Sequence, residues 1–140
     1  MNNKTSHASK TTKVIYWIAT IWLSLGMVSS AIVQLIGMKE EVDMITRLGY
    51  PVYFMTILGV WKMLGVIAVL VPGFSLLKEW AYAGFFFAMS GALISHIIVG
   101  DPLKEIFPPV LLLILIAVSW YLSPHRKNLY LQVKHQDHEF

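Results

Sequence analysis

A lysine lies near the middle of an apolar stretch of this chain. Lys62 falls within residues 52–71, which carry no other charged side chain. A lysine at the centre of a bilayer costs about 2.5–3.5 kcal/mol on insertion scales, so such residues face a bundle interior or a wet cavity. Because intramembrane ionisable residues mark functional sites by default, Lys62 predicts where a ligand-binding or proton-relay site lies.

Two more polar residues lie at the ends of neighbouring apolar segments. Gln34 and His96 are each about three residues from the C-terminal ends of residues 14–37 and 80–99. At 1.5 Å rise per residue they lie roughly 5 Å deep, and Lys62 roughly 15 Å deep. A lysine stem reaches toward the interface by snorkelling, so we expect the three side chains to converge. Carboxylates lie just beyond this end of the bundle, at Asp101, Glu105, Glu40 and Glu41.

Such a cluster could hydrogen-bond a carbonyl group or an anion, and the imidazole could exchange protons. We therefore take Lys62, His96, Gln34, Asp101 and Glu79 as ligand-binding or proton-relay candidates. Each also has a structural interpretation. Lys62 could make an ion pair that holds the bundle together, Gln34 an interhelical hydrogen bond, and His96 could be a satisfied interfacial side chain. Asp101 before Pro102 suits a turn, and Glu79 suits a helix N-terminus.

Four apolar segments must position these residues. They cover about residues 14–37, 52–71, 80–99 and 108–122, and the first three reach the roughly 20 residues that a membrane-spanning helix needs. The fourth is shorter, so its helix is either short and untilted or starts through Pro108 and Pro109, since proline is tolerated in a first turn. The pattern predicts an all-α fold, an integral membrane four-helix bundle in the lipid bilayer.

The predicted organisation is one four-span domain, residues 14–127, between two polar tails. Residues 1–13 are expected to form a disordered cytoplasmic tail, and residues 128–140 a polar C-terminal tail. Orientation follows from the basic residues, of which seven lie on the side of the termini (Lys4, Lys10, Lys13, Lys78, Arg126, Lys127, Lys134) and three on the other (Lys39, Arg47, Lys104). The excess favours cytoplasmic N- and C-termini.

Small residues recur along the spans at helical spacing. Helices in lipid associate where small residues let their backbones approach, so we expect a helix-packing role for Gly26, Gly59, Gly65, Gly84 and Gly91. The deep Trp61 is expected to pack within the bundle or beside a ligand. Tryptophans nearer the span ends, such as Trp80 and Trp120, are expected in the interfacial aromatic belt.

Composition excludes several classes of function. The hydrophobic content is 56% of 140 residues, and the basic residues lie at the ends and in loops, so no nucleic-acid groove is indicated. The absence of cysteine excludes thiol exchange and iron–sulfur ligation by this chain. We expect no metal site, since the C-terminal cluster fits a polar tail: His135, Asp137, His138 and Glu139. No catalytic triad is evident, and the catalytic residues, if the chain is an enzyme, stay unassigned.

Several short motifs together resemble the DoxX-like family of small four-helix membrane proteins. They are Leu-Gly-Tyr-Pro at 48–51, Gly-Val-Trp-Lys-Met-Leu-Gly at 59–65, Val-Pro-Gly at 71–73, Lys-Glu-Trp-Ala-Tyr-Ala-Gly at 78–84, Ser-His at 95–96 and Gly-Asp at 100–101. The resemblance covers about residues 14–127 and implies a four-span bundle in the bacterial inner membrane. Lys62, Glu79, His96 and Asp101 are motif positions in it.

The family name comes from a subunit associated with thiosulfate:quinone oxidoreductase or quinol oxidase complexes. The resemblance therefore favours an accessory or ligand-binding subunit in membrane redox metabolism that binds a quinone-like or other lipophilic small molecule. A quinone is the cofactor we expect. Two alternatives stay open, an oligomeric small-molecule transporter component and a structural membrane partner without its own ligand. A homo-oligomer or a redox-complex subunit would fit these functions.

Overall fold

The chain forms an all-α membrane bundle. The computed structural model describes residues 4–137, and no strand occurs among them. Its elements, in chain order, are α1 (Lys4–Leu35), α2 (Lys39–Arg47), α3 (Tyr53–Leu70), α4 (Ser75–Val99), α5 (Leu103–Leu122) and α6 (Pro124–Gln136). The helices α1, α3, α4 and α5 are long and apolar enough to cross a membrane. The predicted four-helix integral membrane fold is thus confirmed.

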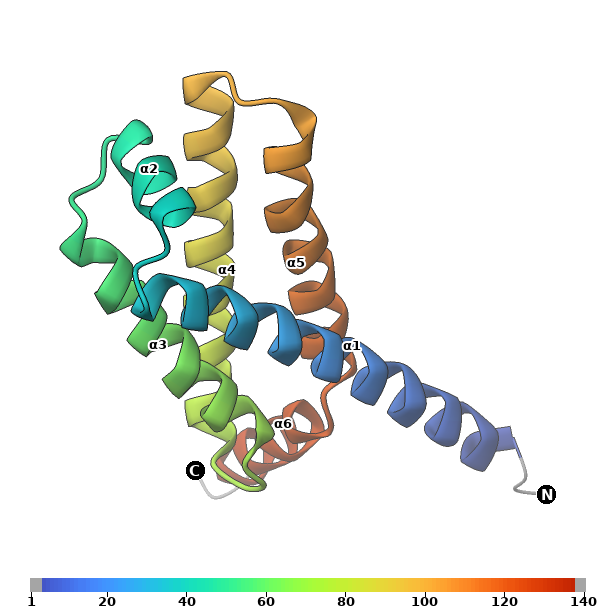
Figure 1. The fold of residues 1–140 in the computed structure, drawn as a ribbon. Helices are drawn as coiled ribbons and strands as arrows, with labels where there is room; N and C mark the ends of the chain where they lie inside the picture. Colours follow the sequence, from blue (N-terminus) through green and yellow to red (C-terminus); the bar gives the residue numbers. More distant parts are fainter. Residues whose placement is uncertain (1–3, 138–140) are drawn as a thin grey trace.

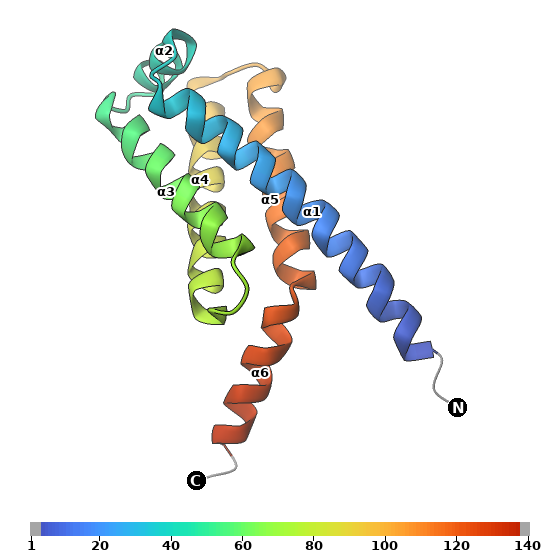
Figure 2. The ribbon, with the colours of Figure 1, turned by 60° about the horizontal axis from the view of Figure 1, so that its bottom comes forward.

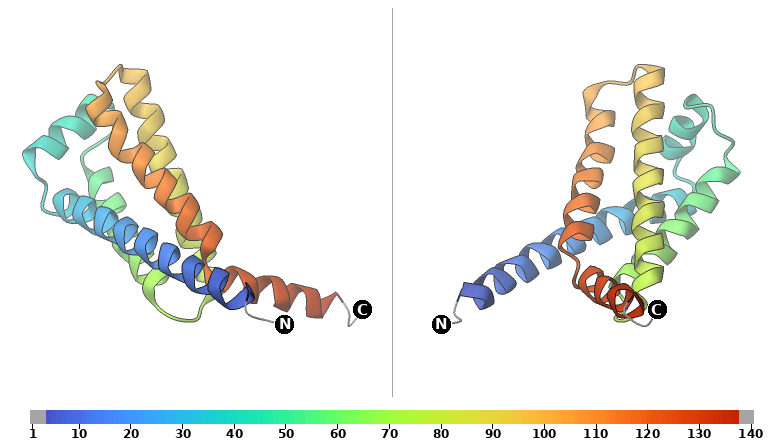
Figure 3. Two further views of the ribbon diagram at one scale, coloured as in Figure 1. Left: turned by 90° about the vertical axis from the view of Figure 1, so that its right-hand side faces the viewer. Right: turned by 180° about the vertical axis from the view of Figure 1, so that it is seen from behind.

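The four spanning helices pack in a ring. α1 contacts α3 and α5, and α4 contacts the same two helices from the opposite side. Both termini lie at one end of the bundle, here called the terminal side, and α2 lies at the other end, the α2 side (Figure 1). The first part of α1 and the later part of α6 extend away from the ring on the terminal side (Figures 2 and 3).

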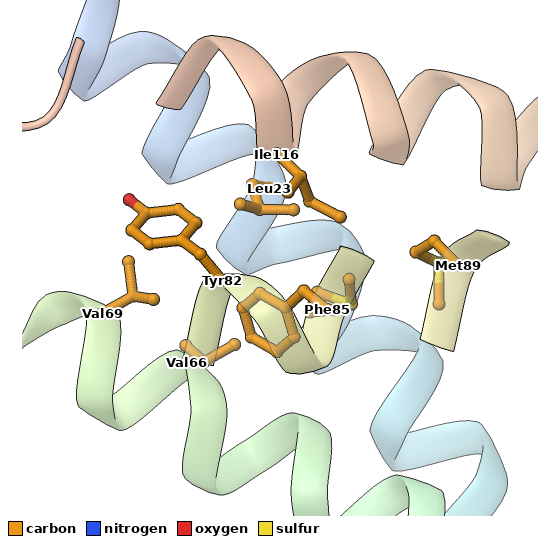
Figure 4. Close-up of a cluster of buried hydrophobic side chains, with 8 residues drawn as sticks. Leu23, Val66, Val69, Tyr82, Phe85, Met89 and Ile116 are labelled. Carbon is orange, nitrogen blue, oxygen red and sulfur yellow. The ribbon is translucent and has the colours of Figure 1, made fainter. Parts of the chain in front are cut away.

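The bundle core is a cluster of side chains from all four spanning helices. Leu23 of α1, Val66 of α3, Phe85 of α4 and Ile116 of α5 are buried together (Figure 4). Lipid tails are as apolar as leucine, so burying leucine away from lipid gains no hydrophobic free energy. In a bilayer these contacts therefore stabilise the fold through close packing. The outward faces carry exposed large apolar side chains such as Trp22, which suits contact with lipid.

The helices are longer than the apolar segments. α4 begins at Ser75, five residues before the expected start at residue 80, and α5 begins at Leu103 and not at Pro108. Hydropathy marks the part of a helix inside the membrane, whereas the backbone hydrogen bonds continue until a turn stops them. Pro108 and Pro109 consequently lie inside α5, beyond its first turn. The sequence had suggested that they form the first turn.

The N-terminal tail differs from its expected disorder, and the C-terminal tail is polar and mostly helical. α1 is helical from Lys4, so the described part of residues 1–13 is not a disordered tail. A helix nucleated within a span elongates at little cost through polar residues that follow or precede it. Most of the expected C-terminal tail is likewise helical, in α6. Residues 1–3 and 138–140, including His138 and Glu139, lie outside the described residues.

A short helix joins the first two spans and was not predicted. α2 is polar and amphipathic, with Ile45 buried and Glu40 and Glu41 in its first turn. Arg47 occupies the last turn, so charges of each sign lie at the helix end that favours them. The connection on the α2 side is therefore ordered and covers this end of the bundle. Residues 39–52, which are α2 and the segment that follows it, are called the roof below.

The five glycines of the packing prediction have different surroundings. A methyl group on Gly26, Gly59 or Gly65 would lie within 3.0 Å of a side chain from a neighbouring helix. Gly84 and Gly91 are different, because a methyl group there would meet nothing within 4 Å. These two glycines border open space, so close helix packing does not explain them.

Candidate functional site

Lys62 is buried between α1 and α3, with only 5% of its surface exposed. Its Nζ donates hydrogen bonds to Ser30 Oγ at 2.7 Å and to Gln34 Oε1 at 3.0 Å. Ser30 and Gln34 are one turn apart on α1, so they share the face that packs on α3. The expected proximity of Lys62 and Gln34 is present, and the helix pairing supplies two acceptors for an ammonium group that has three N–H donors.

A glycine turn brings His96 and Asp101 together. Gly100 adopts a left-handed conformation with φ 78°, which ends α4 and folds the chain back. The Asp101 N–H then bonds to the His96 carbonyl at 3.0 Å. The Asp101 Oδ2 lies 2.6 Å from His96 Nδ1. The carboxylate therefore holds the imidazole by one nitrogen and sets the direction of the other.

The roof is attached to α4 by two polar contacts. The guanidinium of Arg47 lies 3.0 Å from the second oxygen of Asp101. The Tyr50 hydroxyl and Ser95 Oγ are 2.8 Å apart. These contacts hold α2 and the segment that follows it over the ends of the spanning helices.

A cavity of about 170 Å³ lies beneath this roof. Its polar lining comes from Gln34, Lys62, His96 and Tyr50. The apolar lining comes from Met44, Ile45, Leu48, Phe54, Leu58, Phe87, Ala88, Met89, Gly91 and Ala92. Gly91, which touches no neighbouring side chain, is thus one wall of the cavity. Apolar walls with a few convergent polar groups are typical of small-molecule sites.

Hydrogen-bonding capacity remains at this cavity. Among the described residues, Lys62 has two acceptors for its three N–H groups, and the Nε2 atom of His96 has no partner. No fully buried side-chain nitrogen or oxygen in the described part of the chain lacks a hydrogen bond, so Nε2 must border open space. Lys62 and His96 both line the cavity, so their remaining hydrogen-bonding groups are the candidates to bind a molecule in it.

Glu79 does not belong to this cluster. It lies near the start of α4 on the terminal side, where Oε1 is 2.8 Å from His125 Nε2. Its other oxygen accepts a hydrogen bond from Trp120 Nε1 at 2.8 Å. His125 Nδ1 in turn contacts Ser123 Oγ. Of the five candidates, Gln34, Lys62 and His96 line one cavity and Asp101 contacts His96, whereas Glu79 lies at the opposite end of α4.

A chain of hydroxyl groups continues this second cluster into the bundle. Ser119 Oγ is 2.7 Å from the Tyr82 hydroxyl and 2.6 Å from Thr20 Oγ1. Thr20 Oγ1 also donates to the Tyr16 carbonyl at 2.6 Å. Ser119 and Thr20 are fully buried. The terminal-side network thus ties α1, α4, α5 and α6 together through paired polar groups.

Sequence reasoning missed the residues that complete both clusters. Arg47 belongs to a helix that no apolar pattern indicates, and His125 follows the last apolar segment. A weak signal existed for Ser119 and Thr20, because each is a small hydroxyl residue within a span. In lipid such a residue seeks a partner on a neighbouring helix.

Comparison with known proteins agrees with the fold. The model of the DoxX-like family matches residues 18–119, which include the whole of α3 and α4 and most of α1 and α5. No curated protein and no solved structure matches the chain. Since the match extends over well more than half of the sequence, this four-helix membrane protein belongs to the DoxX-like family.

Proposed function

We propose that the chain is a ligand-binding accessory subunit of membrane redox metabolism that binds a quinone-like molecule, or another lipophile with a carbonyl group, in the cavity on the α2 side. The observation that carries the proposal is that Lys62 and His96 both line one largely apolar cavity. The family membership supports a membrane setting for this role. A homo-oligomer or a larger redox complex would complete the assembly.

Lys62 has the first role in the proposed binding mode. Its ammonium donates the third N–H to a carbonyl oxygen of the ligand, while Ser30 and Gln34 hold the other two. A hydrogen bond from a charged donor contributes about 1.5–3 kcal/mol, more than a neutral one. Apolar walls exclude competing water, which strengthens this contact.

His96 has the second role, at another oxygen of the ligand. With Nδ1 held by Asp101, Nε2 accepts a hydrogen bond from a hydroxyl group of a reduced ligand. A protonated ring donates instead to the carbonyl oxygen of the oxidised ligand. The Asp101 carboxylate stabilises that charged ring, and so the pair is suited to relay a proton between ligand and solvent.

The proposed location is the inner membrane, with both termini in the cytoplasm. Seven of the ten Lys and Arg residues outside the spans lie on the terminal side by sequence order. Basic residues are enriched in cytoplasmic segments, which supports this orientation. The ligand cavity would then open toward the outer half of the bilayer.

Co-purification tests the proposal. The full chain is purified in mild detergent, and the organic extract is analysed by mass spectrometry for wild type, Lys62→Met and Lys78→Met. Lys78 is the matched control, because it is a second buried lysine and does not line the cavity. Its Nζ donates a hydrogen bond to the Val69 carbonyl at 2.5 Å. Removing the charged donor of Lys62 should lower the amount of bound lipophile about tenfold or more.

The control variant should retain the lipophile at the wild-type level. Equal amounts in all three proteins would mean that Lys62 does not bind it. A preparation from a native membrane with no carbonyl-bearing lipophile in any of the three would contradict the proposed function itself.

A further inference from the structure

A second hollow lies on the membrane-facing side of the bundle, between α3 and α4. It has a volume of about 410 Å³ and runs along α3 from Leu58 past Lys62 to Ala68, toward the terminal side. Small residues form much of its surface, namely Gly65, Ala68, Ala81 and Gly84. At 1.5 Å per residue, the stretch of α3 from Leu58 to Ala68 is about 15 Å long.

This groove and the cavity under α2 lie next to each other. Leu58, Lys62 and Ala88 line both of them. Lys62 is also the one charged residue that lines the groove in the described part of the chain. Lys62 can therefore be reached from both hollows, which is the arrangement that a ligand with a head and a tail would need.

The two volumes suit different parts of one molecule. The cavity, at about 170 Å³, is close to the roughly 150 Å³ that holds one benzene ring in an apolar protein interior. It is smaller than the roughly 300–1,000 Å³ of sites that enclose a whole drug-sized ligand. The groove, at about 410 Å³, is within that range, and it is lined almost wholly by apolar groups.

We propose that the ligand is a long-tailed amphiphile, with a ring-sized polar head in the cavity and a linear isoprenoid or alkyl tail in the groove between α3 and α4. This inference rests on the proposed function, since Lys62 binds the head. The tail lies against Gly84, above which a Cβ would meet no atom within 4 Å. The ligand then enters sideways from the bilayer, because the groove faces the lipid.

Two probes separate the head from the tail. They are the ubiquinone headgroup without a tail, and decylubiquinone, which is the same ring with a saturated alkyl tail. Binding to the purified full chain is followed by quenching of tryptophan fluorescence, since Trp61 and Trp80 line the groove. Each probe is titrated into wild type, Gly84→Leu, Ala83→Leu and Lys62→Met.

Gly84→Leu fills the groove with a side chain that the helix accepts readily, because leucine is a better helix former than glycine. Ala83→Leu is the matched control, at the adjacent exposed position, which lines the separate groove between α4 and α5. We expect Gly84→Leu to weaken decylubiquinone about tenfold or more, since a blocked apolar pocket costs at least this for a few methylene groups. The tailless ring should bind Gly84→Leu and wild type alike, and Ala83→Leu should change neither probe.

Two results would overturn the inference while leaving the proposed function in place. In the first, Gly84→Leu binds both probes like wild type, although Lys62→Met weakens both. In the second, Gly84→Leu dissociates an oligomer, measured by light scattering, without changing decylubiquinone affinity, so that a second copy of the chain occupies the groove. Failure of both probes to bind wild type would instead contradict the proposed quinone site, and this inference with it.

Discussion

The two ends of α4 carry similar pairs in different surroundings. On the α2 side, His96 and Asp101 lie 2.6 Å apart, and on the terminal side His125 and Glu79 lie 2.8 Å apart. Both histidines are buried. His125 has a side-chain partner at each ring nitrogen and stacks on the Tyr82 ring. His96 has a partner at one ring nitrogen among the described residues, and the residue lines a cavity.

The difference lies in how much hydrogen-bonding capacity is already used. On the terminal side, each polar group joins another helix of the same chain, as Ser119 does with Thr20 and Tyr82. On the α2 side, Lys62 and His96 keep capacity at an open space. The comparison therefore predicts a ligand site where the donors and acceptors of a polar residue exceed its partners, and a structural role where they match.

The terminal-side network should contribute mainly to stability. Ser119→Ala removes two hydrogen bonds and leaves the buried Tyr82 hydroxyl without its partner. We expect the free energy of unfolding to fall by about 1–2 kcal/mol, measured by thermal or denaturant unfolding in detergent. Ser90→Ala is the control, because that hydroxyl donates to the Phe87 carbonyl of its own helix and should cost little. Weaker binding of the quinone headgroup by Ser119→Ala at unchanged stability would break the comparison.

The carboxylate of Asp101 should act on binding through His96. Asp101→Asn keeps a turn residue before Pro102 but removes the charge that holds the imidazole. We expect the affinity for the tailless headgroup to fall about fivefold, the equivalent of one hydrogen bond of about 1 kcal/mol. Glu105→Gln in the first turn of α5 is the control and should bind like wild type. An unchanged affinity for Asp101→Asn would show that the orientation of His96 does not matter to the ligand.

Arg47 should have the smallest effect. Its side chain is 52% exposed, and an ion pair between partly solvated groups contributes roughly 0.2–1 kcal/mol. Arg47→Ala should therefore lower headgroup affinity about twofold at low ionic strength, by loosening the roof over the cavity. The difference from wild type should shrink in high salt, which screens the pair in the wild-type protein. A loss much greater than this, and independent of salt, would place Arg47 in contact with the ligand.

The spans could be read from the sequence because a bilayer requires long apolar runs with their backbone groups paired internally. The helix ends could not be located in this way, since residues 75–79 and 103–107 continue helices beyond the apolar segments. α2 was missed for a related reason. Its nine residues are mostly polar, and it gains order from its place above the bundle, with Ile45 directed inward.

The sequence predicted which candidate side chains lie close together only where their depth in the bilayer determines it. Lys62 and Gln34 meet because their depths and the reach of a lysine stem allow it. Glu79 was grouped with them by motif, although α4 carries it to the opposite end of the bundle. The partners of Glu79 depend on where α6 folds back, which no local pattern encodes. Likewise, Gly84 and Gly91 have the spacing of packing glycines, and only the three-dimensional arrangement shows that they border open space.

The most direct test of this contrast is thermal unfolding with and without saturating decylubiquinone, for wild type, Lys62→Met and His125→Phe. A ligand that binds only the folded protein raises its Tm. His125→Phe should unfold at a lower temperature because it loses the partners Glu79 and Ser123, yet keep the ligand-induced rise. Lys62→Met should unfold at an unchanged or higher temperature, since replacing a buried charge by an apolar group often stabilises, but lose that rise. The account is contradicted if Lys62→Met keeps the rise, or if His125→Phe is the variant that loses it.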